Sequence, residues 1–102
     1  MNETQRRRLA THLVILNRRE LLARPSTTSR SKAHEVAQAR LNEACETASI
    51  VLGSPTGFAV AMDVHDACTE AGANWQGRLG AQVDSDWTDD AVARLLVLWE
   101  NR

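Results

Sequence analysis

Helix-breaking residues divide this chain into segments of helical length. The sequence has two prolines, and each follows a long stretch with helical periodicity. Pro25 ends the first stretch, because a proline disfavours the helical conformation for the residue before it. Gly53 and Pro55 end the second, since glycine readily adopts the left-handed conformation that closes many helices. Long helical stretches that end at such residues predict an all-α fold.

Apolar periodicity predicts one compact four-helix domain, residues 1–102, because a chain of this length normally forms a single domain. A polar linker is expected at 25–31 and one irregular connection at 72–86. Three apolar residues are expected to anchor that connection to the core: Trp75, Leu79 and Val83. The helices are expected at 4–23, at 32–52, at 56–72 and from Thr88 onward.

Capping residues mark two of the helix starts. Ser31 can cap the second helix, because a serine hydroxyl accepts hydrogen bonds from the backbone N–H groups of the first turn. Thr88 can cap the fourth, and the two aspartates that follow it would meet the positive end of the helix dipole. Trp87 would then pack on Val92 as a hydrophobic staple.

The third helix is expected to be central, because apolar residues cover more than half of its circumference. Phe58 and His65 fall inside that apolar arc, so His65 is expected in the core or at its boundary. A narrow stripe of carboxylates runs opposite and is expected to face solvent. The stripe consists of Asp63, Asp66 and Glu70.

Charge is unevenly distributed along the chain. Residues 1–32 carry eight basic side chains against two glutamates, whereas residues 33–102 carry four arginines against eleven carboxylates. Such a split favours either an internal complement or a partner with a charged face.

An apolar pair on the first helix lies between arginines. On a helical wheel, Ile15 and Leu22 are flanked on both sides by arginine pairs. An apolar centre with a polar rim is typical of protein interfaces. We therefore expect a partner-binding surface here that consists of Arg7, Arg8, Ile15, Arg18, Arg19 and Leu22.

Other interpretations of this surface stay open. Its arginines could follow the phosphates of a nucleic acid, meet the carboxylates of a second copy in a homodimer, or remain solvated, as most charge runs do. Ile15 and Leu22 could instead pack against the 72–86 connection.

The carboxylate stripe of the third helix is a second candidate surface for a partner. The second and third helices have the outline of a helix-turn-helix motif. A recognition helix offers basic or amide side chains to base edges, and Asp63, Asp66 and Glu70 would repel phosphates. We therefore expect the stripe to occupy a basic nucleic-acid-binding site on the partner, or the arginines of the first helix to bind an acidic patch there.

Candidate reactive residues are few. Cys45 and Cys68 form no CxxC motif, so both are expected to be reduced and buried. His65 and Cys68 are three residues apart and could touch one metal ion, but a structural zinc site needs four ligands. No catalytic or phosphate-binding motif is present. We expect no enzymatic activity, no cofactor and no metal.

The sequence also bears on location. Its apolar runs are too short to span a bilayer. A basic cluster, 6–8, precedes an apolar stretch in the manner of a secretory signal, but Thr11 and His12 interrupt that stretch. A cytoplasmic protein without membrane contact is expected.

The segment WTDDAVARLLVLW, residues 87–99, resembles the opening of Myb/SANT-like and GcrA-type DNA-binding domains. In those families a tryptophan, a cap and an acidic turn start such a helix, and the last of two further helices reads DNA. The resemblance covers only these residues, and the DNA-reading helix has no counterpart before Arg102. We expect a helix that packs on the core.

These observations favour a small, non-enzymatic regulatory protein that binds a protein or nucleoprotein partner. Proteins of this kind are common among phage and mobile-element accessory products, including anti-CRISPR-like inhibitors of host nucleoprotein complexes. The alternative is a regulator that binds nucleic acid through its basic N-terminal helix.

Overall fold

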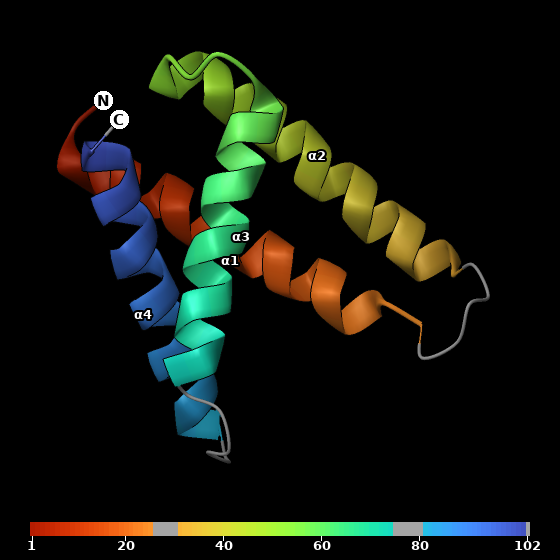
Figure 1. Ribbon diagram of the computed structural model, residues 1–102. Coiled ribbons are helices and arrows are strands. Elements are labelled where there is room, and N and C mark those ends of the chain that lie inside the picture. Colours follow the sequence, from red (N-terminus) through yellow and green to blue (C-terminus); the bar gives the residue numbers. More distant parts are fainter. Residues whose placement is uncertain (26–30, 75–80, 102) are drawn as a thin grey trace.

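The computed structural model describes residues 1–25, 31–74 and 81–101, which form four α-helices and no strand (Figure 1). The predicted all-α, four-helix fold is confirmed. Of the residues expected to anchor the 72–86 connection, Trp75, Leu79 and the side chain of Val83 lie outside the described part of the chain. The helices are α1 (Glu3–Ala23), α2 (Lys32–Leu52), α3 (Gly57–Asn74) and α4 (Ala81–Glu100).

Local capping sets the ends of α1 and α2. Asn2 and Gln5 form a reciprocal capping box, in which each side chain accepts the other's backbone N–H at 2.8 and 3.0 Å. The Ser31 hydroxyl accepts the backbone N–H of His34 at 3.3 Å, which confirms the predicted cap. Gly53 closes α2 with a φ of 70°. The bounds of α2 therefore match the prediction.

The start of α4 corrects the prediction. The helix begins at Ala81, so residues 81–86 are helical and Thr88 lies inside α4. No glycine or proline stands between Ala81 and Thr88, so nothing interrupts the helix at the capping pattern. Trp87 is an internal helical residue, and the expected staple between Trp87 and Val92 is wrong.

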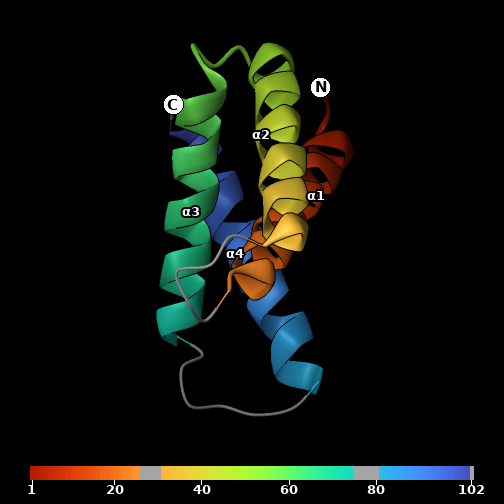
Figure 2. The ribbon, with the colours of Figure 1, turned by 90° about the vertical axis from the view of Figure 1, so that its right-hand side faces the viewer.

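α1 and α3 form the middle of the domain. Each contacts all three other helices, whereas α2 and α4 make no contact with each other within the described residues. In the view of Figure 1, α4 lies to the left of α3 and α2 to its right; in the view of Figure 2, α2 lies between α3 and α1. The expectation that α3 is central is confirmed, and α1 shares that position.

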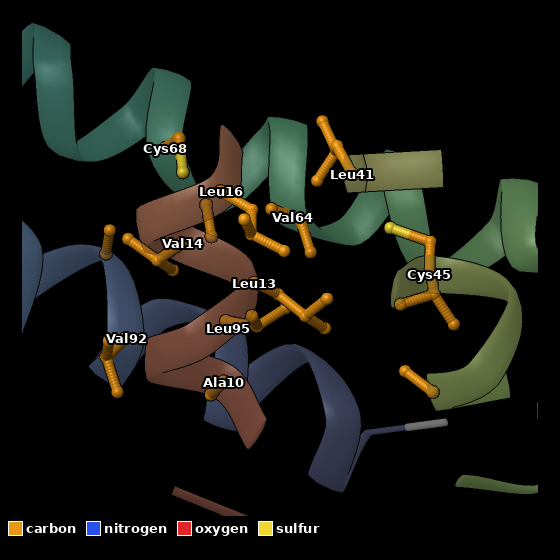
Figure 3. Close-up of a cluster of buried hydrophobic side chains, with 14 of the residues drawn as sticks. Ala10, Leu13, Val14, Leu16, Leu41, Cys45, Val64, Cys68, Val92 and Leu95 are labelled. Carbon is orange, nitrogen blue, oxygen red and sulfur yellow. The ribbon is translucent and has the colours of Figure 1, made fainter. Parts of the chain in front are cut away.

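Side chains from all four helices meet in one core (Figure 3). Leu13 of α1, Val64 of α3 and Leu95 of α4 are among its largest fully buried members. The contribution of α2 is small by comparison, because two of its three buried apolar residues are Cys45 and Ala48. The core consists of Ala10, Leu13, Val14, Leu16, Leu41, Cys45, Ala48, Val60, Val64, Ala67, Cys68, Ala71, Ala91, Val92 and Leu95.

Some residues expected in the core are exposed. Phe58, near the start of α3, is 73% exposed. Helical periodicity also places Leu21 of α1, and Ala33 and Val51 of α2, on apolar arcs, and all three are exposed. The buried stripes are therefore narrower than the apolar arcs of the sequence.

A buried carboxylate connects α1 to the beginning of α2. Glu20 is 4% exposed. It accepts hydrogen bonds from Arg24 at 2.9 and 3.2 Å and lies 2.7 Å from Nε2 of His34. Burial raises the pKa of Glu20, but the hydrogen bonds from Arg24 and His34 outweigh it and hold that pKa below its ordinary value of 4.5.

A glycine allows α3 to approach α2 closely. Gly57 is buried at the start of α3, and a Cβ atom there would lie 3.0 Å from the Cα of Glu46 and would collide with the Glu46 side chain. The two helix axes are bent by 106° across the intervening turn. Gly57 thus helps to fix the angle at which α3 follows α2.

Replacing Gly53 with alanine is expected to lower the free energy of unfolding by about 1–2 kcal/mol, because an L-residue is strained at positive φ. No heavy atom lies within 4 Å of the added Cβ, so the loss would be one of backbone strain. Chemical denaturation measures it. Gly53→Asn is the control and should lose less, because asparagine tolerates this conformation. Equal losses for the two variants would contradict the strain explanation.

Replacing Glu20 with glutamine is expected to destabilise the protein at pH 7 by about 1–3 kcal/mol, the usual contribution of hydrogen bonds to a charged group. The folded pKa of Glu20 is depressed, so its contribution is complete above pH 4.5 and is lost as pH falls through the folded pKa. Denaturation at a series of pH values should show the two proteins converging below pH 4.5. A constant difference at every pH would refute this assignment, and exposed Glu43→Gln provides the control.

Candidate functional site

The side of α1 that faces away from the core carries most of the predicted binding residues. Arg7, Arg8 and Arg19 are exposed, and two large apolar side chains accompany them: Ile15, 37% exposed, and Leu22, 74% exposed. We call these five residues the outer face of α1. A shallow hollow of about 530 Å³ on this face is lined by Arg7, Arg8 and Ile15, among others.

Arg18 has a structural role at one edge of this face. Its guanidinium lies 5.1 Å from the ring centroid of Trp87 in α4, which is cation–π distance. Trp87 also packs against α3, because a Cβ atom on Gly72 would be 3.5 Å from the indole nitrogen. Arg18 is therefore half-buried and joins α1 to α4, unlike the other arginines predicted here.

The arginines of the outer face have no counter-charge among the residues that the structure describes. Arg7, Arg8 and Arg19 form no ion pair in the part of the chain that the structure describes. Elsewhere Arg24 is paired with Glu20, and Arg94 with carboxylates of α3 and α4. The positive charge of the outer face therefore remains available to a partner.

A groove between α1 and α2 adjoins the outer face. It consists of two hollows of about 400 and 380 Å³, which share Leu16 and Arg40. We call it the α1–α2 groove. Arg19 belongs to both surfaces, because it lines the larger hollow. Helical periodicity does not predict this groove, because it places Ala33 on the apolar arc of α2 and assigns Arg40 no role.

The carboxylate stripe of α3 faces solvent only in part. Asp66 and Glu70 are exposed, as predicted. Asp63 is 5% exposed, which corrects the prediction, and it faces a hollow that Arg6 and Trp99 also line. Glu70 accepts a hydrogen bond at 3.2 Å from Arg94 of α4, so this member of the stripe also takes part in the contact between α3 and α4.

Arg94 is the cation that balances the α3–α4 seam. Its Nε donates to Asp90 at 2.9 Å, one turn earlier in α4, while its Nη1 donates to Glu70. These carboxylates raise the pKa of Arg94 above its ordinary value. Glu70 and Asp90 thus serve the contact between two helices of this chain.

The exposed side of α3 differs from that of a DNA-recognition helix. Phe58, Met62 and His65 are exposed, and α3 contains no lysine or arginine. The expectation that His65 belongs to the core is wrong. Apolar residues cover so much of α3 that the wheel did not indicate which arc faces inward.

The cysteines are buried in their neutral form. Cys45 and Cys68 are free thiols, 1% and 4% exposed, as predicted. Burial raises the pKa of each thiol to about 11. His65 lies on the exposed side of α3, away from buried Cys68. Among the described residues, no three His, Cys, Asp or Glu side chains are grouped as metal ligands.

Two further findings concern the whole chain. Comparison with known protein families, curated proteins and solved structures finds no match. Within the described residues, no single helix has the length and apolar content needed to cross a membrane; α2 and α3 reach that composition only together, across their 106° bend. The resemblance of residues 87–99 to Myb/SANT-like and GcrA-type domains does not extend to geometry, since Trp87 and Thr88 do not begin a helix.

Thiol reagents are expected to modify Cys45 and Cys68 of the folded protein about 100-fold more slowly than free thiols, because a pKa two units higher leaves less thiolate. Mass spectrometry after timed alkylation measures the rates. Thr69→Cys places a thiol on an exposed position beside Cys68 and should react quickly. Rapid modification of Cys45 or Cys68 in the folded wild-type protein would contradict this burial.

Proposed function

We propose that this protein is a non-enzymatic regulatory protein that binds a protein partner through the outer face of α1. The observation that carries the proposal is the exposure of Ile15 and Leu22 among arginines that have no ion pair in the described residues. α1 contacts all three other helices, and fully buried Leu13 lies on the side of α1 opposite Ile15. This arrangement supplies apolar anchors within a charged rim, as in protein interfaces.

A protein partner suits this face better than nucleic acid. Phosphate contacts require cations, and Arg7, Arg8 and Arg19 could provide them. The centre of the face, however, is formed by Ile15 and Leu22. Leu22 would gain little from a hydrated phosphate backbone, whereas a protein pocket would remove its apolar surface from water.

The narrower form of the proposal is an anti-CRISPR-like inhibitor, carried by a phage or mobile element, that acts on a host nucleoprotein complex. The outer face of α1 would cover an acidic patch on a protein subunit of that complex. The α3 stripe is less suited to occupy a basic nucleic-acid site, because Asp63 is buried and Glu70 is paired with Arg94.

A photo-crosslinking amino acid in place of Ile15 is expected to capture one partner in the cells that carry this sequence, whereas the same probe at Val97 should not. Val97 is the matched control, because it is 55% exposed on α4, outside the outer face. The double substitution Ile15→Asp and Leu22→Asp should weaken the purified complex about 30-fold or more, the loss typical of interface anchors. Isothermal titration measures this change.

The outcomes separate the alternatives. Unchanged affinity of the double variant, with Val97→Asp as control, would refute the proposal. Binding of duplex DNA that weakens with a log–log salt slope of about −3, and that requires Arg7, Arg8 and Arg19, would establish the nucleic-acid alternative instead. Capture of a second copy of this chain would indicate a homodimer, and capture of a nucleoprotein subunit would support the narrower form.

A further inference from the structure

The floor of the α1–α2 groove is apolar and built from small side chains. Leu16 of α1 lines both hollows, and Ala33, Ala37 and Ala44 of α2 line one or the other. The hollows together follow α2 from Lys32 to Val51, a length of about 28 Å at the rise of an α-helix. Small side chains let another chain approach the α2 backbone closely.

The walls of the groove are positively charged. Arg19, Lys32 and Arg40 line the larger hollow, and none of its other described lining residues is acidic. Arg40 also lines the smaller hollow, where Glu43 is the one acidic residue among the described lining. None of the three cations forms an ion pair in the described part of the chain. An occupant with carboxylates beside apolar residues would complement this surface.

We propose that the α1–α2 groove binds an amphipathic helix of the partner, with its apolar side on the alanine floor and its carboxylates against Arg19, Lys32 and Arg40. The proposal rests on the proposed function and specifies which element of the partner is held. The same partner would cover the outer face of α1, since Arg19 lines the groove and belongs to that face.

A helix is favoured over an extended peptide because of backbone hydrogen bonding. Both walls of the groove are α-helices, whose internal N–H and C=O groups are already paired. They offer no strand edge to an extended chain, which would lose hydrogen bonds to water without replacement. A helical ligand satisfies its own backbone and needs only apolar and ionic contacts.

Selection from a displayed library of random peptides, about 16 residues long to match some 24 Å of helix, tests the proposal. Peptides enriched on the folded full-length protein should carry apolar residues at spacings of three and four with an excess of Asp and Glu. Their affinity should fall at least about tenfold on Ala33→Phe, which fills the larger hollow, and on Arg40→Glu, which reverses its charge.

Matched controls use the opposite side of α2. Ala39→Phe adds the same bulk at an exposed alanine that lines neither hollow. The double substitution Gln38→Glu and Asn42→Glu changes the net charge as much as Arg40→Glu does, at exposed positions. Both controls should bind the selected peptides as the wild-type protein does, and circular dichroism should show equal helix content in every variant.

Three results would overturn the inference: no enrichment, enriched peptides without acidic excess, or equal binding to Ala33→Phe and Ala39→Phe. Different results would refute the groove and the proposed function. If the Ile15→Asp and Leu22→Asp variant loses the cellular partner while Ala33→Phe keeps it, the partner uses the outer face of α1 without the groove. If the groove peptides bind but the outer-face variant keeps its partner, the proposed function is refuted.

Discussion

Contact of α1 with all three other helices is the constraint on which most of this structure depends. Those contacts bury the side of α1 that is centred on Leu13, and none of the described helices covers the opposite side. The exposure of Ile15 and Leu22 follows from this arrangement, because every helix that could cover them already packs on the far side. The outer face is therefore a consequence of the fold, and the rigidity of the buried side fixes its geometry.

The α1–α2 groove depends on a weaker arrangement. α2 has two neighbours, α1 and α3, and no contact with α4 within the described residues. Its end near Gly57 is fixed by close backbone approach, and its beginning by the hydrogen bond between Glu20 and His34. The α2 side chains that line the groove include four alanines, which are too small to fill the space between the two helices. Because α2 is held at both of its ends and carries small residues between them, the hollows between α1 and α2 remain open.

The sequence predicted what is encoded locally. Ser31 and Gly53 marked the ends of α2 correctly, because capping and left-handed closure act within one turn. The helical wheel of α1 placed Ile15 and Leu22 on the exposed side, because most apolar residues of this helix lie on the opposite side. On α3 that arc covers more than half the wheel, so Asp63 and His65 were assigned to the wrong sides. The capping pattern at Thr88 predicted the wrong start for α4, because such a pattern does not interrupt a helix whose earlier residues include no glycine or proline. The groove depends on how closely α1 and α2 pack along their length, which periodicity does not encode.

The fold shows which charges of the unevenly charged sequence are paired within the domain. The carboxylates of the α3–α4 seam have Arg94 as their counter-charge, and Glu20 has Arg24 and His34. Five other cations receive no such complement from the described residues: Arg7, Arg8, Arg19, Lys32 and Arg40. Like charges on one surface repel one another weakly in water, so their neutralisation stabilises a complex and leaves the free domain little changed. Because that stabilisation requires an anionic partner to be brought against Ile15 and Leu22, charge would select the partner and the apolar anchors would retain it.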